Sequence, residues 1–222
     1  MMPFEGGIDS LPNGTLILSA IAALLYLAAQ GNEPSLRRTV VKTASTGLLA
    51  LLAWIEGGPV LLVVALALSA AGDAFLAQDG ERPFLFGLAS FLAAHIAYAP
   101  LFLSIGGGAD ILVWQPWRLG LAIAAIVGAA LLMRRLLPAA GPRMRLPVAV
   151  YAAAILAMTL AAATVPSPLI VLGAILFVLS DSLLATGRFL LAPGAPRQRH
   201  AGMAVWILYY LAQAAITLGF LL

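Results

Sequence analysis

Residues 59–77 read PVLLVVALALSAAGDAFLA, an apolar run that contains a single charged residue, Asp73. The hydrocarbon core of a bilayer is crossed by roughly 20 predominantly apolar residues in helical conformation. Two glycines precede the proline of this run, and a Gln-Asp-Gly segment follows it, as is typical of the boundaries of a helix. We therefore predict that this stretch forms a membrane-spanning helix.

Apolar segments of the same kind recur along the whole chain. With glycine, proline and charge clusters taken as boundaries, they predict about eight transmembrane helices. The predicted helices cover residues 15–30, 38–54, 59–77, 83–104, 117–137, 146–163, 168–188 and 201–221. The predicted fold class is all-α, a polytopic membrane helix bundle that forms a single integral membrane domain over residues 1–222.

The composition supports this fold class and excludes several others. Of the 222 residues, 63% are hydrophobic and 9% are charged, whereas soluble domains carry about a quarter charged residues. A nucleic-acid partner would need the basic residues gathered on one exposed face, but here they lie in short segments between apolar runs. The chain has no cysteine, which excludes disulfides and cysteine-based metal or redox chemistry.

The basic residues predict the orientation of the helices, because Lys and Arg near helix ends resist translocation. The segments after the odd-numbered helices contain Arg37, Arg38, Arg82, Arg134, Arg135, Arg143, Arg145, Arg188, Arg197 and Arg199. The opposite side carries Arg118 and the acidic residues Glu5, Asp9, Glu56 and Asp110. We therefore expect both termini on the non-cytoplasmic side. The Ala- and Leu-rich composition, with Arg used in preference to Lys, indicates a bacterial protein, and we expect it to be a multi-pass protein of the cytoplasmic (inner) membrane.

A short internal similarity links two of the predicted helices. Residues 72–77 read GDAFLA and residues 180–185 read SDSLLA, four helices further along. Because these two helices run in the same direction, the similarity would mark a parallel repeat of four plus four helices. Chance explains so short a match equally well.

Ionisable side chains inside the predicted helices indicate a site. They are Lys42, Asp73, His95 and Asp181, and such groups should face the bundle interior and find partners because hydrocarbon disfavours charge. Lys42 and both aspartates lie within about two helical turns of the cytoplasmic end, while His95 lies deeper and would form a floor. The alternatives are a structural ion pair between Lys42 and an aspartate, or a Lys42 that extends to the lipid headgroups.

Uncharged polar residues lie at comparable or middle depth. They are Tyr98, Ser180, Tyr209, Tyr210 and Gln213. They would supply hydrogen-bond donors and acceptors to a site, although each taken singly is more typical of the polar contacts that hold membrane helices together.

Two carboxyl groups that lie close together in a low-dielectric site do not both ionise easily, so one acts as an acid and the other as a base. This pair suits protonation of a substrate and stabilisation of the resulting cation, as in the cleavage of acetals or enol ethers. A proton-coupled transporter of small molecules or lipids is the alternative. With two histidines, no HExxH and no Walker-type loop, we expect neither a metal nor another cofactor.

Single positions in the sequence disfavour two further classes of membrane protein. Gly72-Asp73 matches half of the GxGD motif of intramembrane aspartyl proteases, but Ala70 stands at the first glycine. A retinal protein would need a lysine in the last helix, and residues 201–221 contain none.

In combination and order, these residues resemble the YhhN family of membrane proteins over most of the chain. The resemblance is carried by Lys42, the GDAFL segment at 72–76, Phe84, Gly87, Phe91, His95, Tyr98, Tyr151, FVLSDSLLA at 177–185 and YYLAQ at 209–213. It implies an eight-helix enzyme that hydrolyses the vinyl-ether bond of a lysoplasmalogen. The implied products are a fatty aldehyde and glycerophosphocholine or glycerophosphoethanolamine.

The implied reaction gives each candidate residue an expected role. Asp73 and Asp181 would be catalytic, one as general acid and the other as stabiliser of the cation, with the assignment left open. Lys42 and arginines at the cytoplasmic rim would hold the lipid phosphate. The other expected substrate-binding residues are His95, Tyr98, Tyr151, Ser180, Tyr209, Tyr210 and Gln213. A lysophospholipid and membrane lipids are the expected partners, a related ether lysolipid is the alternative substrate, and the sequence neither indicates nor excludes a homodimer.

Overall fold

The computed structural model describes residues 2–191 and 196–222, with side chains omitted for 196–199. In this part of the chain all regular structure is helical. The nine helices are α1 (Leu11–Ala29), α2 (Leu36–Ile55), α3 (Val60–Leu76), α4 (Glu81–Ile105), α5 (Asp110–Trp114), α6 (Pro116–Ala139), α7 (Gly141–Ala162), α8 (Pro168–Phe189) and α9 (Pro196–Leu221). The all-α bundle predicted from the sequence is therefore confirmed.

Each predicted helix has one observed counterpart, and the largest differences lie at helix starts. The first helix begins at Leu11 rather than at residue 15 because Pro12 occupies the first turn, where its missing N–H needs no partner. The five-residue α5 was not predicted. It lies in the connection between α4 and α6, and so short a helix has no apolar periodicity to reveal it.

Length and composition qualify six described helices as membrane spans. These are α1, α4, α6, α7, α8 and the part of α9 from His200 onward. Of the other two long helices, α3 has 17 residues and α2 carries Arg37, Arg38 and Lys42, which lower its hydropathy. The chain is thus a helical membrane protein, while the count of eight spans and the sides of the termini stay predictions.

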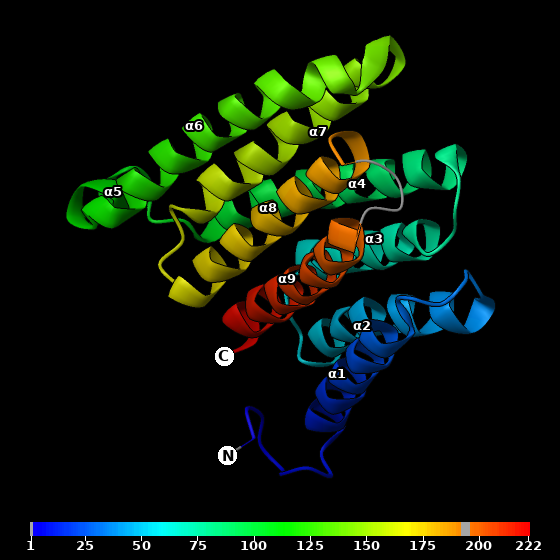
Figure 1. Cartoon of the computed structure of the whole chain (residues 1–222). Helices are drawn as coiled ribbons and strands as arrows, with labels where there is room; N and C mark the ends of the chain where they lie inside the picture. Colours follow the sequence, from blue (N-terminus) through cyan, green and yellow to red (C-terminus); the bar gives the residue numbers. More distant parts are fainter. Residues whose placement is uncertain (1, 192–195) are drawn as a thin grey trace.

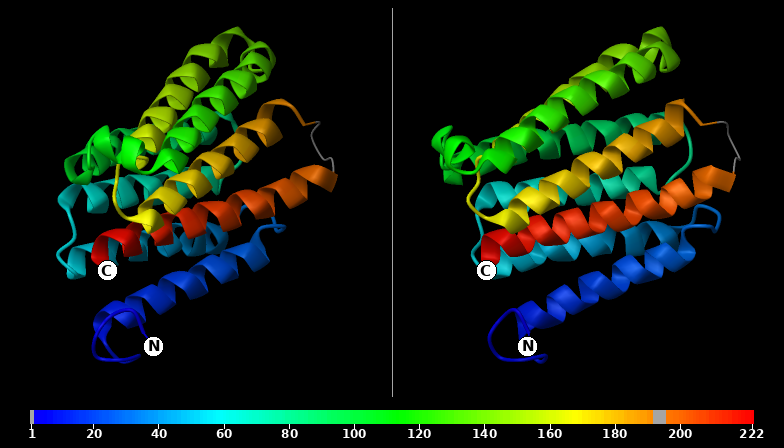
Figure 2. Two further views of the ribbon diagram at one scale, coloured as in Figure 1. Left: turned by 90° about the vertical axis from the view of Figure 1, so that its left-hand side faces the viewer. Right: turned by 60° about the vertical axis from the view of Figure 1, so that its left-hand side comes forward.

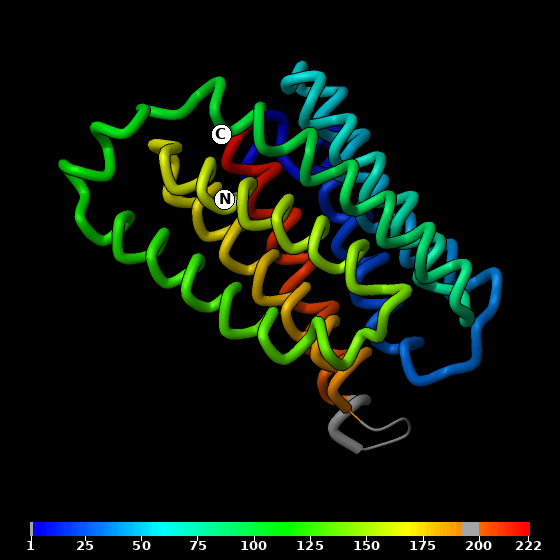
Figure 3. The backbone as a smooth tube through the Cα atoms, turned by 90° about the horizontal axis from the view of Figure 1, so that it is seen from above, coloured from blue at the N-terminus to red at the C-terminus, as the bar shows by residue number. Residues whose placement is uncertain are grey.

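The helices form a layered bundle with α6 at one edge and α1 at the other (Figure 1). The closest packing joins α8 to α9, α3 to α4, and α2 to both α1 and α3. Seen from above, α6 forms one flank and α3 and α4 the opposite flank, with α7, α8 and α9 between them (Figure 3).

The two termini lie at the same end of the bundle, and the α1–α2, α3–α4 and α6–α7 connections lie at the other end (Figure 2). Most of the arginines that predict a cytoplasmic side lie in the helix ends next to these connections, within about two turns of them. Arg197 and Arg199, which belong to the same set, lie outside the residues whose side chains are described.

The acid-bearing helix α3 approaches α4 closely because glycines face the contact. A Cβ atom added to Gly72 would lie 2.6 Å from the ring of Phe91, and one added to Gly87 would lie 2.7 Å from the side chain of Leu76. The Phe91 ring is held at its edges by Phe177 and Tyr209. A larger residue at position 72 would therefore push against a ring that has little room to move.

We predict that Gly72→Ala lowers the free energy of unfolding by about 1–2 kcal/mol because overpacking outweighs the gain in helix propensity. Gly120→Ala is the matched control, since an added Cβ at Gly120 in α6 meets no atom within 4 Å, and it should be neutral or stabilising. Unfolding of both variants in detergent measures the difference. Equal stability of the two would contradict this account of the contact.

Candidate active site

Asp73 projects from α3 toward α2 and α9 and is 1% exposed. Its Oδ1 atom lies 3.6 Å from the Lys42 Nζ atom. Its Oδ2 atom accepts hydrogen bonds from the hydroxyl groups of Thr46, at 2.9 Å, and Tyr209, at 2.7 Å. The ion pair that the sequence left open as a structural alternative is therefore present.

Lys42 is held inside the bundle and does not extend to the headgroups. Its ammonium lies 5.4 Å from the ring centre of Tyr26 and 5.8 Å from that of Trp206, within range of a cation–π contact. The indole N–H of Trp206 donates to the carbonyl of Ala23, which fixes the ring. Thr46 and Tyr26 were not predicted to belong to the site. Thr46 lies four residues after Lys42 on the same helical face, and this spacing is the sequence signal that identifies it.

Asp181 projects from α8 toward α4 and α7. Its Oδ2 atom lies 3.2 Å from His95 Nε2 and accepts a short hydrogen bond from the Tyr151 hydroxyl. The other ring nitrogen of His95 lies 3.3 Å from the sulfur of Met158. Because the His95 side chain is fully buried and the Asp181 side chain is 12% exposed, the histidine supports the carboxyl group from behind.

The partner helices of the two carboxyl groups correspond under a shift of four long helices, the same shift that separates GDAFLA from SDSLLA. Asp73, on the third long helix, receives its partners from the second and eighth, α2 and α9. Asp181, on the seventh long helix, receives its partners from the sixth and fourth, α7 and α4. The eight long helices can be numbered in chain order, with the count starting again after the eighth. Adding four to the numbers of the helices around Asp73 then gives the numbers of the helices around Asp181. Within the described residues no hydrogen bond joins the two carboxyl groups, so each is the centre of its own cluster.

A polar cavity of about 310 Å³ contains both aspartates in its wall. Lys42, Ser180 and Tyr209 also line it, and Arg38 and Arg188 contribute the remaining basic groups. Asp79 also lines the cavity, which therefore combines three carboxyl groups with three cationic side chains.

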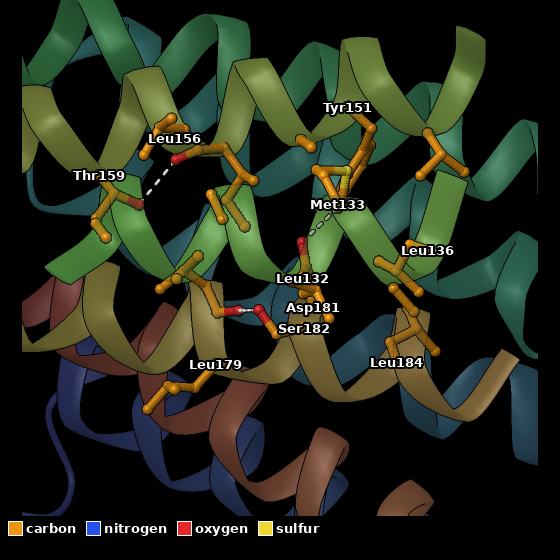
Figure 4. Close-up of a pocket in the computed structure, with 18 of the residues that line it drawn as sticks. Leu132, Met133, Leu136, Tyr151, Leu156, Thr159, Leu179, Asp181, Ser182 and Leu184 are labelled. Carbon is orange, nitrogen blue, oxygen red and sulfur yellow. Dashed lines mark hydrogen bonds between the residues drawn. The ribbon is translucent and has the colours of Figure 1, made fainter. Parts of the chain in front are cut away.

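An apolar groove of about 290 Å³ lies between α6, α7 and α8 and extends to the start of α4. Figure 4 shows Asp181 and Tyr151 beside the aliphatic side chains of Leu132 and Met133. Three residues, Phe84, Asp181 and Leu184, line both the groove and the polar cavity. Asp181 thus lies at the junction of a polar and an apolar space.

The remaining predicted residues lie behind these walls. Tyr98 donates a 2.6 Å hydrogen bond to Gln213, whose amide nitrogen lies 3.5 Å from the Tyr209 hydroxyl. Tyr210 is bonded to Ser19 at 3.0 Å. Of the residues expected to bind substrate, Lys42, Ser180 and Tyr209 line the cavity and Tyr151 lines the groove. The other four, His95, Tyr98, Tyr210 and Gln213, line neither space. Among the described residues no cluster of three or more His, Cys, Asp or Glu could hold a metal ion.

The fold and these two spaces define a helical membrane protein with an intramembrane carboxylate site at a polar–apolar junction. Residues 37–220 match the YhhN family, and the chain belongs to this family. It is 34% identical over 163 residues to proteins named lysoplasmalogenase from Mycobacterium bovis and Mycobacterium tuberculosis. The match covers 72% of this chain and 59% of each relative, so the chain spans less than two thirds of their length. No solved structure matches the chain.

The buried ion pair between Lys42 and Asp73 leads to a prediction about stability that does not depend on which reaction the site catalyses. Lys42→Met leaves the Asp73 carboxyl group buried without its counter-charge, and we expect a loss of about 3 kcal/mol in the free energy of unfolding. The double variant Lys42→Met, Asp73→Asn should recover most of that loss, since both charges are then removed.

The matched control for this pair is Arg143→Met. Arg143 lies 3.4 Å from Glu81, with side chains 82% and 55% exposed, and an exposed pair of this kind contributes at most about 1 kcal/mol. Unfolding of all three variants in detergent gives the comparison. If the Lys42→Met variant were as stable as the Arg143→Met variant, the buried pair would contribute little to the free energy of unfolding.

Proposed function

We propose that the protein hydrolyses the vinyl-ether bond of a lysoplasmalogen, or of a related single-chain ether lysolipid. The products are a fatty aldehyde and a glycerophospho-headgroup. The observation that carries the proposal is the position of Asp181, which lines both the polar cavity and the apolar groove. An amphiphile with its headgroup in the cavity and its chain in the groove places the bond between them beside this carboxyl group. The names of the mycobacterial relatives support the same reaction.

The reaction needs one acid, one water molecule and a stabiliser of positive charge. A proton adds to the vinyl carbon farther from the ether oxygen, and the carbon bonded to that oxygen becomes part of an oxocarbenium ion. Water adds to this carbon and returns a proton to the acid, which yields a hemiacetal. Transfer of the hemiacetal hydroxyl proton to the ether oxygen, with cleavage of its bond to carbon, releases the aldehyde and the glycerol hydroxyl.

We assign the acid to Asp181 and the charge stabilisation to Asp73. Asp181 is the carboxyl group at the junction, and Tyr151 and His95 orient it. Asp73 faces the polar cavity with Lys42, Thr46 and Tyr209 as fixed partners, and such preorganised groups stabilise charge that develops in a transition state. Water reaches the bond from the polar cavity, because the groove is lined mainly by aliphatic side chains.

The lipid phosphate lies against Arg38 and Arg188 in this proposal. Both line the polar cavity, whereas Lys42 is already paired with Asp73. The Arg38 Nε atom is buried and has no hydrogen-bond partner within the described part of the chain. Arginine suits a phosphate because its planar fork of donors matches the phosphate oxygens. Since both arginines belong to the predicted positive side, the headgroup enters from the cytoplasmic face of a bacterial inner membrane.

Transport is the less favoured function. Transporter sites are commonly built on interrupted helices near the middle of the membrane. The helices that carry Lys42, Asp73, His95, Tyr151 and Asp181 are each continuous through the position of the site residue. No feature of the site favours a transport cycle over hydrolysis.

The direct test incubates the purified protein in detergent with a lysoplasmalogen and with its saturated-ether analogue, and follows aldehyde release by mass spectrometry. We expect aldehyde from the vinyl ether alone, with kcat reduced by at least about 100-fold in Asp73→Asn and in Asp181→Asn, as is usual for the loss of an acid or base. Asp110→Asn, in the exposed α5, is the control. Folded protein that releases no aldehyde would overturn the proposal.

The phosphate assignment has a separate test. Arg38→Gln and Arg188→Gln should each raise KM for the lysoplasmalogen about tenfold, the effect of losing a charge-assisted hydrogen bond of about 1.5 kcal/mol. Neither variant should change KM for an alkenylglycerol that lacks the phosphate. Arg143→Gln, whose side chain is 82% exposed and lines neither space, serves as control. An equal rise in KM for both lipids would assign these arginines to folding rather than to the phosphate.

A further inference from the structure

We propose that the apolar groove binds the single hydrocarbon chain of the substrate, and that small residues of α6 set the longest chain it accepts. The inference rests on the proposed function for the identity of the lipid, but the groove itself is a feature of the fold. The ligand proposed for the groove is a single alkenyl chain that continues from a headgroup in the polar cavity. The shared wall at Asp181 supplies that continuity.

One face of α6 forms the outer wall of the groove. The lining residues of α6 are Leu121, Ala124, Ala125, Gly128, Ala129, Leu132, Met133 and Leu136. They recur at intervals of three and four residues, which places them along a single helical face. From Leu121 to Leu136 this face is about 22 Å long at the helical rise, longer than the ~15 Å of hydrocarbon in one leaflet. The groove is thus long enough for the chain of a membrane lipid.

The groove is open to the surrounding membrane along its α8 side. The helix α6 packs mainly on α7 and only weakly on α8. Leu179 of α8, which lines the groove, is 48% exposed. The opposite face of α6 carries Ile123, Ile126 and Val127, each about half exposed, as expected for a helix in contact with lipid. A chain therefore enters sideways between α6 and α8 without crossing the polar cavity.

The direction of the chain follows from the position of the headgroup. Arg38 lies at the start of α2 and Arg188 at the end of α8. Figure 2 shows both of these helix ends at the end of the bundle that holds the α1–α2 connection, so the chain runs from Asp181 away from that end. Asp181 lies at the level of Leu132 and Met133 (Figure 4). From Leu132 to Leu121 the remaining groove is about 17 Å long. Gly128 lies about one turn along this path.

Gly128 is the position at which the groove is most easily narrowed. A Cβ atom added there meets no atom within 4 Å, and the residue lines the groove. A larger side chain at this position therefore extends into the groove without displacing a packed neighbour. Gly120 is the matched control, because it belongs to the same helix, is equally free of contacts and does not line the groove.

The first test measures kcat/KM of wild type, Gly128→Leu and Gly120→Leu on lysoplasmalogens of increasing chain length. Each methylene kept out of an apolar site lowers binding severalfold, so displacement of about two or three of them predicts at least a tenfold change. We expect Gly128→Leu to lower the ratio of long-chain to short-chain kcat/KM at least tenfold and Gly120→Leu to leave it unchanged. A parallel loss at all lengths, or no change in the ratio, overturns the proposal.

The second test does not depend on hydrolysis, so it separates failure of the groove from failure of the proposed reaction. A saturated-ether lysolipid with a photoreactive diazirine at the chain terminus is cross-linked to the purified protein, and the labelled peptides are identified by mass spectrometry. We expect labelling within α6 and α7 that Gly128→Leu reduces at least fivefold and Gly120→Leu does not. Labelling mainly of α1 or α2, or labelling that Gly128→Leu leaves unchanged, overturns the proposal even if the protein is an active hydrolase.

Discussion

The need to give two buried carboxyl groups partners inside a membrane bundle is the constraint on which the rest of the structure depends. Hydrocarbon disfavours charged and unpaired polar groups, so Asp73 and Asp181 each determine which helices lie beside them. Asp73 requires α2, with Lys42 and Thr46, and α9, with Tyr209. Asp181 requires α4 and α7. These four partner helices and the two that carry the acids form the centre of the bundle, while α1 and α6 lie at its edges.

The clusters around Asp73 and Asp181 correspond in their arrangement of helices, and this correspondence adds a structural observation to a weak sequence similarity. The six-residue match between GDAFLA and SDSLLA does not by itself distinguish a repeat from chance. The structure adds that each acid-bearing helix packs most closely on the helix that follows it in the chain, and that the partner helices are related by the same shift of four. The side chains themselves have diverged, since a lysine faces Asp73 and a histidine faces Asp181. The two carboxyl groups thus have corresponding partner helices but chemically different partners, as the separate roles proposed for them require.

The sequence predicted the helices and the depth of the ionisable residues, because both follow from distances along one helix. The Lys42–Asp73 pair could be anticipated for the same reason. The sequence could not predict that Tyr151 donates to Asp181, or that Tyr98 and Gln213 lie behind the cavity wall. These facts depend on the rotation of each helix and on which helices are neighbours, and small apolar residues all around a membrane helix leave both undetermined. The groove could not be predicted because its wall consists mainly of alanines, leucines and other apolar residues that no motif distinguishes.

The difference between the two carboxyl groups bears on how one chain of helices handles an amphiphile. Asp73 is 1% exposed and held by an ammonium and two hydroxyls, so it is fixed before a substrate arrives. Asp181 keeps part of its surface free at the one place where polar and apolar walls meet. A vinyl ether lies at the same boundary within its own molecule, between headgroup and chain. For the substrate proposed above, the bilayer would orient the lipid by the same polarity gradient that shapes the protein. Alignment of the bond with Asp181 would then follow from partition into the two spaces rather than from a large set of specific contacts.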